Sequence, residues 1–181
     1  AGSSSASYCA GTTILLTSTP SGGTLGYTYV WSGPQSFSNL TQNPSISNAT
    51  TLMSGIYQVE LTDNNGCTAS ASTNFITVQP ALSVTAGSNS PVCAGGTINL
   101  NSSPGGGTPT YTFTWSGPSS FASGLQNPNI TSADLSKAGT YNVTITDAFG
   151  CSGTATTSVT VNTGVTANAG TDKTIPSCSV S

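Results

Sequence analysis

Charge is what this sequence has least of. Its 181 residues include two lysines and five acidic residues but no arginine and no histidine, so charged side chains make up 4% of the chain. An ordinary soluble domain has about 25%. A nucleic-acid interface needs a cluster of basic side chains, and two lysines cannot supply one. The sequence therefore predicts no nucleic-acid partner.

Residues that carry catalytic chemistry are equally scarce. Without histidine or a pair of neighbouring carboxylates, there is no obvious general base to activate the many Ser and Thr hydroxyls. Zinc sites of the Cys/His type are excluded too, because the five cysteines are widely spaced and no histidine exists. We expect a protein that is not an enzyme and that uses no cofactor.

Long apolar runs are also missing. No stretch of 18 apolar residues occurs, so we expect no membrane insertion. The chain has neither an initiator Met nor a signal peptide, and both of its ends fall inside the repeat described below. We therefore expect a segment of a longer array, for which a missing signal does not argue against export.

What the sequence does have is an internal duplication. Residues 9–73 recur as residues 93–157, offset by 84 positions with no insertion or deletion, and the copies begin CAGTTILLTSTPSGGTLGYTYVWSGPQSF and CAGGTINLNSSPGGGTPTYTFTWSGPSSF. A period of this length corresponds to a whole small domain. We predict a first repeat at residues 1–79, truncated at its start, and a second at residues 80–163. Residues 164–181 are predicted to be the start of a third repeat or a donated strand.

Each copy shows the alternation that is typical of strands. From Tyr27 to Trp31 and from Tyr57 to Leu61, large side chains recur at every second position, as they do at the equivalent positions of the second copy. Period two, abundant Thr and Val, and turn clusters every 8–12 residues indicate an all-β sandwich. Disorder is the alternative for a chain so rich in Ser and Gly, but the patterning and the low charge favour collapse.

The motifs of each copy resemble those of immunoglobulin-like and PKD-like sandwich domains. The resemblance rests on a Trp in the third strand (Trp31 and Trp115) and on the pattern G-x-Y-x-V-x-[LI]-T-D, which contains Tyr57 and Tyr141. It implies tandem immunoglobulin-like β-sandwich repeats, in which these tyrosines form the corner whose hydroxyl bonds back to the chain. The tryptophans share a face with residues expected to point inward, so we predict core packing. A sugar-stacking platform is the alternative.

The fuller pattern is C-A-G…Y-x-[YF]-x-W-S-G-P…Q-N-P-x-I…G-x-Y-x-V…T-D-x-x-G-C. It is similar to the tandem repeats of very large secreted and cell-surface proteins of Bacteroidetes-type bacteria. Members of that group are commonly exported by the type IX route and include gliding adhesins. The resemblance covers essentially the whole chain and implies an extracellular or cell-surface location. It leaves the role open, because such repeats occur in adhesins, stalks and accessory regions of enzymes.

Four of the five cysteines are equally spaced. Cys9 and Cys67 are 58 positions apart, and so are Cys93 and Cys151. This spacing predicts one disulfide within each repeat, which contributes about 4 kcal/mol in the chain-entropy treatment and implies an oxidising compartment. Free buried thiols are one alternative, and a bridge from Cys67 to Cys93 across the repeat junction is another. Cys178 is expected to open the third repeat.

Two carboxylates recur at the end of the strand before each hairpin. Asp63 and Asp147 are the weak candidates for calcium ligands in a chain for which we otherwise predict no metal. A lone carboxylate with Asn neighbours is more typical of a turn cap.

The shortage of lysine also bears on assembly. Proteins usually protect sheet edges with Lys, Pro or inward-pointing charges, so here either glycans, short strands and prolines shield the edges or the edges pair with neighbouring copies. The linker of Gln79, Pro80 and Ala81 predicts a semi-rigid rod.

We therefore predict a structural repeat segment of an extracellular bacterial filament or cell-surface adhesin. It would act as a disulfide-stapled stalk or fibre subunit that contacts other copies or neighbouring repeats of the same polypeptide. The alternative is a carbohydrate-binding or accessory module of a larger secreted enzyme, with glycans as partners.

Overall fold

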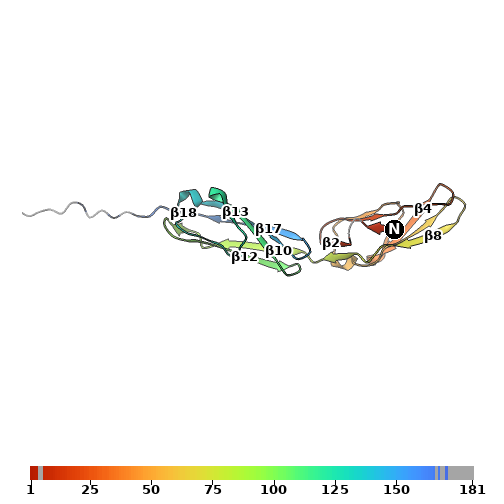
Figure 1. Ribbon diagram of the computed structural model, residues 1–181, viewed down its shortest axis with the longest axis horizontal. Helices are drawn as coiled ribbons and strands as arrows, with labels where there is room; N and C mark the ends of the chain where they lie inside the picture. Colours follow the sequence, from red (N-terminus) through yellow and green to blue (C-terminus); the bar gives the residue numbers. More distant parts are fainter. Residues whose placement is uncertain (4–5, 166, 168–169, 171–181) are drawn as a thin grey trace, which may run out of the picture.

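The computed structural model describes residues 1–3, 6–165, 167 and 170, which form two β-sandwiches placed end to end (Figure 1). The described residues contain no α-helix, so the all-β prediction is confirmed. Each sandwich has its own hydrophobic core, and the two cores share no residue. The linker between them is short, because the first sandwich ends at Gln79 and the second begins at Leu82.

The first sandwich is built from two facing sheets. Its strands are β1 (Gly2–Ser3), β2 (Ser7–Cys9), β3 (Ile14–Thr17), β4 (Thr28–Gly33), β5 (Phe37–Asn39), β6 (Ser45–Ile46), β7 (Gln58–Thr62), β8 (Thr68–Ser72) and β9 (Thr77–Gln79), with single 3-10 turns η1 (Pro34–Ser36) and η2 (Thr51–Met53). One sheet has the order β5-β4-β7-β8 and the other β1-β3-β6. Strand β2 pairs in parallel with β9, the last strand of the domain.

The second sandwich repeats this topology. Its strands are β10 (Leu82–Ser88), β11 (Val92–Cys93), β12 (Ile98–Gly106), β13 (Thr112–Gly117), β14 (Phe121–Ser123), β15 (Asn129–Ile130), β16 (Gly139–Thr146), β17 (Ser152–Val159) and β18 (Val161–Asn162), with 3-10 turns η3 (Pro118–Ser120) and η4 (Leu135–Lys137). The sheets are β14-β13-β16-β17 and β10-β12-β15, and β11 pairs in parallel with β18. The chain is a tandem of Ig-like domains.

The large aromatic residues occupy the centre of each core. Trp31, Trp115, Tyr57 and Tyr141 are all 0% exposed. Each tyrosine hydroxyl donates to a backbone carbonyl four residues upstream, at 2.8 Å in both domains. That bond is the tyrosine corner of immunoglobulin-like domains. Burial of this kind leaves neither tryptophan available as a sugar-stacking platform.

The W-S-G-P motif makes room for the corner tyrosine. A Cβ atom at Gly33 would overlap the ring of Tyr57, and a Cβ at Gly117 would overlap the ring of Tyr141. Each tyrosine ring also packs edge to face against a phenylalanine, with centroids 5.5 Å apart in both domains. Glycine is therefore required at this position, because any side chain would displace a core ring.

The Q-N-P motif ties the two sheets together. In the first domain the Asn43 side chain accepts from the Ser18 amide at 2.9 Å, and the Gln42 side chain donates to the Ser18 carbonyl at 3.0 Å. The Gln42 carbonyl accepts from the Trp31 indole at 3.3 Å. The second domain repeats these bonds with Ser102, Gln126, Asn127 and Trp115. The motif is thus a structural clamp around the buried tryptophan.

The two sandwiches differ at the first strand. In the second domain β10 pairs with β12 over seven residues, and Leu82 and Val84 pack against the core. In the first domain β1 pairs with β3 over only two residues. The first sandwich therefore has no described counterpart of the start of β10.

Candidate functional site

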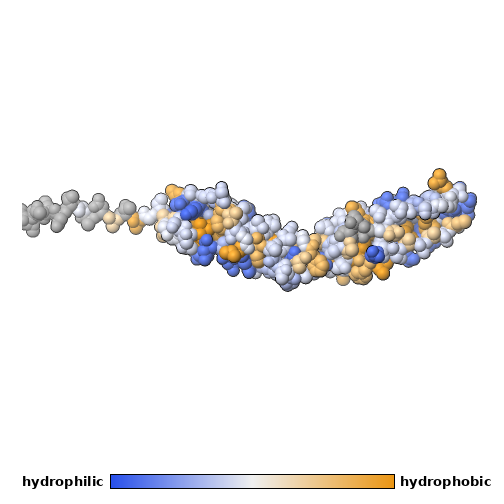
Figure 2. Space-filling view, in the orientation of Figure 1, coloured by the Kyte–Doolittle hydropathy of each residue, from blue (hydrophilic) through white to orange (hydrophobic). Residues whose placement is uncertain are grey.

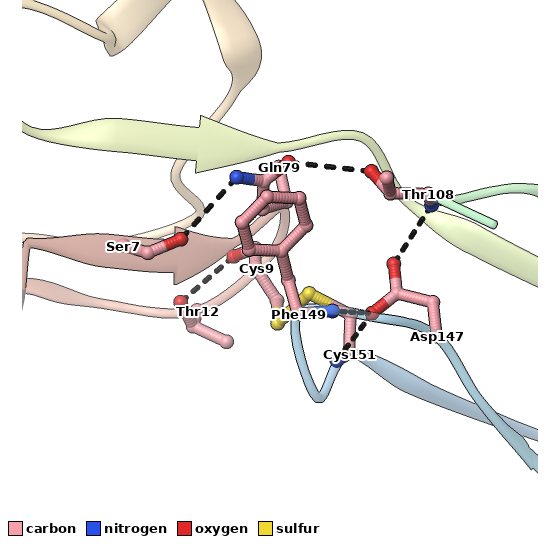
Figure 3. The surroundings of a disulfide bond; sticks show 8 residues. All are labelled: Ser7, Cys9, Thr12, Gln79, Thr108, Asp147, Phe149 and Cys151. Atoms are coloured by element: carbon pink, nitrogen blue, oxygen red, sulfur yellow. Dashed lines mark hydrogen bonds between the residues drawn. A yellow bond between two sulfur atoms is a disulfide. The ribbon is translucent and has the colours of Figure 1, made fainter. Parts of the chain in front are cut away.

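The junction between the two domains combines a disulfide with polar contacts from both domains. Here the hairpin between β16 and β17 meets strands β2 and β9 of the first domain (Figure 3). The carboxylate of Asp147 shapes that hairpin, because its Oδ1 accepts from the amides of Phe149 and Cys151, each at 2.9 Å. Gly150 has φ 83°, a left-handed conformation that favours glycine. The T-D-x-x-G-C motif therefore fixes where Cys151 points.

A disulfide links the domains at this point. Cys9, at the end of β2, bonds to Cys151, with 5.6 Å between the Cα atoms and 142 positions between them in sequence. The backbone around Cys9 is held on the last strand of its own domain, because the Ala10 amide donates to the Gln79 carbonyl at 3.0 Å. The bridge therefore joins the two domains where they adjoin, although its cysteines lie near the start of the first domain and near the end of the second.

The predicted pairing within each repeat is wrong. Cys9 lies where its domain adjoins the junction, whereas Cys67 lies in the hairpin between β7 and β8 at the opposite end of the same sandwich (Figure 1). The alternative bridge between Cys67 and Cys93 is not formed either, because both thiols are free and exposed. Cys178, expected to open a third repeat, lies outside the described residues, as does most of the segment 164–181.

A polar chain crosses the junction beside the disulfide. Gln79 is 7% exposed, and its amide nitrogen donates to the Ser7 hydroxyl at 3.3 Å. Its Oε1 accepts from the Thr108 hydroxyl of the second domain at 3.5 Å. The Thr108 amide in turn donates to Asp147 Oδ2 at 2.9 Å. Both domains thus contribute to one continuous set of hydrogen bonds (Figure 3).

The pKa values of the two hairpin carboxylates, Asp63 and Asp147, follow from the hydrogen bonds that each accepts. Burial by itself raises the pKa of Asp147, but backbone amides, above all those of Thr108 and Cys151, outweigh it and hold the pKa below the ordinary value. The amides of Thr24 and Cys67 lower the pKa of Asp63 in the same way. Both carboxylates act as caps of their own turns. Among the described residues, no group of three or more metal-ligating side chains comes together.

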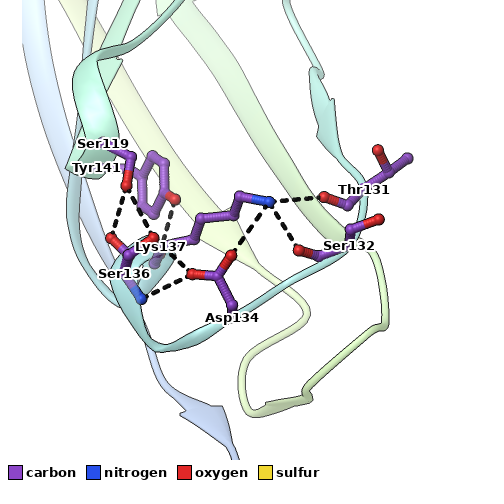
Figure 4. A network of polar contacts seen from close by, with 7 residues as sticks. All are labelled: Ser119, Thr131, Ser132, Asp134, Ser136, Lys137 and Tyr141. Carbon is purple, nitrogen blue, oxygen red and sulfur yellow. Dashed lines mark hydrogen bonds and ion pairs between the residues drawn. The ribbon is translucent and has the colours of Figure 1, made fainter.

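A second polar cluster lies at η4 (Figure 4). Lys137 donates to the carbonyl of Ser132 at 2.7 Å and lies 3.6 Å from Asp134. Asp134 also accepts from the amide and the hydroxyl of Ser136, at 2.8 and 2.5 Å. The cluster caps a 3-10 turn at the surface, and Met53 occupies the position of Lys137 in the first domain. Its role is local and structural.

The outer ends of the molecule carry the two free thiols. Cys67 precedes β8 at one end of Figure 1, and Cys93 belongs to β11, which pairs with β18 at the other end. Between them the face shown in Figure 2 is largely of intermediate hydropathy, with hydrophilic and hydrophobic patches on both domains. No helix of the described chain is long and apolar enough to cross a membrane.

No protein-family profile and no curated protein matches the sequence. Among solved structures, the three N-terminal domains of the bacteriophage RB49 highly immunogenic outer capsid protein are 21% identical, with a TM-score of 0.43, over 88% of this chain and 57% of that one. The four N-terminal Ig domains of Dscam1 isoform 6.9 are 16% identical, with a TM-score of 0.39, over 86% of this chain and 43% of that one.

The amphioxus IgVJ-C2 molecule is 16% identical, with a TM-score of 0.40, over 85% of this chain and 99% of that one. This chain therefore spans about half of the length of the capsid and Dscam1 structures it matches. The likeness to all three is one of fold.

Proposed function

We propose that this chain is a structural segment of an extracellular bacterial filament or cell-surface adhesin, in which Ig-like repeats form a stalk or fibre subunit. The observation that carries the proposal is the disulfide between Cys9 and Cys151, which joins neighbouring domains instead of closing one. Structural disulfides are typical of oxidising compartments outside the cytosol. The bacterial source rests on the resemblance of the repeated motifs.

The junction is connected covalently at two places. The linker of Pro80 and Ala81 is one connection and the disulfide is the other. Domains joined by a single linker move relative to each other by default. A second covalent link beside the first removes most of that freedom, and the buried Gln79 accepts a hydrogen bond across the gap from Thr108. A stiff rod is what a stalk requires.

The disulfide also shields the fold from tension. When the two ends of the chain are pulled, force passes from Cys9 directly to Cys151 through the sulfur atoms. The residues between them carry no tension once the bridge is taut, so they cannot be drawn out into an extended chain. Both cores lie almost entirely within this closed loop.

The surface suits association that resists salt. With charged residues at 4% of the chain, contacts between copies must use uncharged groups. Salt screens charges and leaves such contacts nearly unaffected. The alternative function as a carbohydrate-binding module relied on an exposed aromatic platform, whereas both tryptophans are fully buried.

Single-molecule force spectroscopy tests the mechanical role. The loop closed by the disulfide spans 142 positions, which corresponds to about 500 Å of fully extended chain. We expect this length to be absent from unfolding traces of the oxidised protein and to appear after reduction. Release of the full length without reductant contradicts the proposal. Electron micrographs of the native material provide the second test, because filaments or stalks are expected.

A further inference from the structure

The two cysteines of the interdomain bridge differ in how far solvent reaches them. Cys151 is 3% exposed, whereas Cys9 is only partly buried. A disulfide is cleaved when a thiolate attacks one of its two sulfur atoms, and access decides which sulfur is attacked. A small thiol therefore reaches Cys9 in preference to Cys151.

Cys151 is held in place independently of the bridge. Asp147 Oδ1 accepts from the amides of Phe149 and Cys151, each at 2.9 Å (Figure 3), and the Asp147 amide donates to the Cys151 carbonyl at 2.9 Å. All of these bonds are made by the backbone and one carboxylate, so cleavage of the disulfide leaves them intact. The Cys151 thiol therefore stays at the junction after cleavage.

Cys9 is also held by bonds that cleavage does not touch. The Thr12 amide and hydroxyl donate to the Cys9 carbonyl at 3.1 and 2.8 Å, and the Ala10 amide donates to the Gln79 carbonyl at 3.0 Å. The parallel pairing of β2 with β9 places Cys9 opposite Gln79 in the same domain. Both cysteines thus keep their backbone settings when the bond between them is cut.

The short linker keeps the two cysteines close to each other. Pro80 and Ala81 still join the domains after cleavage, and the Thr108 hydroxyl still has Gln79 as its acceptor across the junction. Groups joined by a short linker meet at an effective concentration of about a millimolar. The Cys151 thiol therefore displaces a small thiol from Cys9 whenever that thiol is more dilute, and the bridge closes again.

Tension along the chain prevents this closure. While the bridge is intact it carries the load, because Cys9 and Cys151 bound the closed loop. Once a thiol has cut the bond, the load pulls Cys9 away from Cys151, and the effective concentration falls toward zero as the sites separate. Force by itself leaves the covalent bridge in place, and a dilute thiol by itself is expelled. Only the two together hold the joint open.

We propose that the junction is a redox switch that opens when a small thiol and tension act on it together. Cys9 is the cysteine that the thiol attacks, and Cys151 is the resolving thiol that restores the bridge when the load is removed. Opening adds the closed loop of 142 positions to the extensible length of the chain. This proposal rests on the proposed structural function and specifies how its joint is regulated.

The chemistry is an exchange of one disulfide for another. The thiolate of reduced glutathione attacks the Cys9 sulfur, a bond forms between them, and the bond to Cys151 breaks. Cys151 leaves as a thiolate and takes a proton from water. In the reverse step the Cys151 thiolate attacks the Cys9 sulfur and expels the glutathione thiolate. One disulfide is present before and after each step, so no further oxidant or reductant is required.

The position of attack is tested in a chain whose other cysteines are removed by Cys67→Ser, Cys93→Ser and Cys178→Ser. A brief exposure to reduced glutathione is stopped with acid, and peptide mapping locates the mixed disulfide. We expect glutathione on Cys9 at least about tenfold more often than on Cys151, because access governs attack. Equal labelling of the two cysteines, or labelling mainly of Cys151, overturns the proposal. The same mapping of the unsubstituted chain guards against an effect of the serines.

The resolving role is tested by mixing the reduced triple-serine chain with oxidised glutathione. With Cys151 present the mixed disulfide on Cys9 should be transient, whereas in the further variant Cys151→Ser it should persist. Asp147→Ala removes the acceptor that holds the Cys151 hairpin and should slow expulsion of glutathione about tenfold, a decade in effective concentration. Asp63→Ala, the equivalent change in the other hairpin, should leave the rate unchanged. Equal rates in these two variants, both folded by circular dichroism, refute the resolving role.

Force spectroscopy of the whole chain tests the requirement for tension. In reduced glutathione at about 0.1 mM, below the effective concentration at the junction, the unloaded protein should keep its bridge. Molecules held under load in the same solution should lengthen by up to about 500 Å, the extended length of the closed loop of 142 positions. Loss of the bridge without load, or lengthening that glutathione does not accelerate, refutes the switch.

Native material separates the switch from the broader function. Filaments or stalks whose junctions exchange equally at both cysteines, or open in dilute glutathione without load, leave the structural function intact and refute the switch. Load-dependent exchange at Cys9 in the purified chain, together with native material that forms neither filaments nor stalks, refutes the structural function and retains the switch.

Discussion

The hairpins at residues 63–67 and 147–151 have nearly the same internal geometry but opposite surroundings. In both, an aspartate accepts from the amide two residues ahead and from the amide of the cysteine, at 2.9 Å in every case. Only in the hairpin at the junction are the aspartate and the cysteine buried, with Asp147 6% and Cys151 3% exposed. The burial therefore comes from the neighbouring domain and not from the hairpin's own sequence. At this junction each domain therefore supplies one half of the interface, and the other domain completes it.

The two sandwiches also differ in how far the second strand of this hairpin is covered. Strand β17 alternates between exposed and half-buried residues, because β10 contacts it, whereas all five residues of β8 are exposed. The sequences of the two domains are closely similar, so this contrast arises from the strand that covers one sandwich and not the other. The substitutions below use equivalent positions of the two domains to test that view.

The largest expected effect comes from the cysteines. Removing the disulfide by the double substitution Cys9→Ser and Cys151→Ser should lower the free energy of unfolding by about 5 kcal/mol, because the bridge closes a loop of 142 positions. The double substitution Cys67→Ser and Cys93→Ser should change it by less than about 0.5 kcal/mol, since these thiols are exposed and unpaired. Urea denaturation of both variants measures the difference, and equal losses contradict the assignment.

The second-largest expected effect is the loss of stability when a core tryptophan is removed. Trp31→Ala and Trp115→Ala should each lower the stability of their own domain by about 3–5 kcal/mol, because each deletes a fully buried side chain. In a background without the disulfide, two unfolding transitions are expected, and each substitution should move only one. Calorimetry distinguishes them. A shift of both transitions by either variant contradicts independent cores.

The sequence is sufficient to predict those core positions but not the partner of each cysteine. Alternation identifies Trp31 and Tyr57 as inward-facing, because a strand places every second residue on one face. Equal spacing of cysteines, in contrast, is compatible with a bridge inside each repeat and with a bridge between successive repeats. Which of these two bridges forms depends on the parallel pairing of β2 with β9, because that pairing places Cys9 at the junction.

The role of the Q-N-P motif is likewise not predictable from the sequence alone. The duplication reveals that it recurs, but its role depends on Ser18, which lies 24 positions before Gln42 and reaches it only after the sandwich closes. Likewise, the covered and uncovered states of the two hairpins cannot be read from their sequences, because they depend on the adjacent domain. Local pattern predicts strands and core, whereas contacts between distant segments require the fold.

The third effect is the loss of stability in acid, which should differ between the two hairpins. The pKa values of Asp63 and Asp147 are lowered in the folded state, so the stability they provide is complete above the ordinary pKa of about 4 and is lost as the pH falls below it. Asp147→Asn should weaken this acid dependence and also reduce stability at neutral pH, more than Asp63→Asn does, because Asp147 is buried at the junction. Urea midpoints at pH 7 and pH 3 measure both changes, and an unaltered acid dependence in both variants contradicts this account.

The smallest effect is expected where the domains differ in sequence without differing in fold. Lys137 pairs with Asp134 at the surface, at 3.6 Å, while Met53 packs against the first core at the equivalent place. Lys137→Met should change stability by less than about 0.5 kcal/mol, because an ion pair at the surface contributes little and the amide and hydroxyl of Ser136 still donate to the Asp134 carboxylate. Met53→Lys should cost more, since it removes a partly buried apolar side chain and Thr50 offers no carboxylate in return. Thermal unfolding of both variants at low and high salt checks this order. If Lys137→Met proves the more damaging change, then the ion pair stabilises the turn more than its exposure implies.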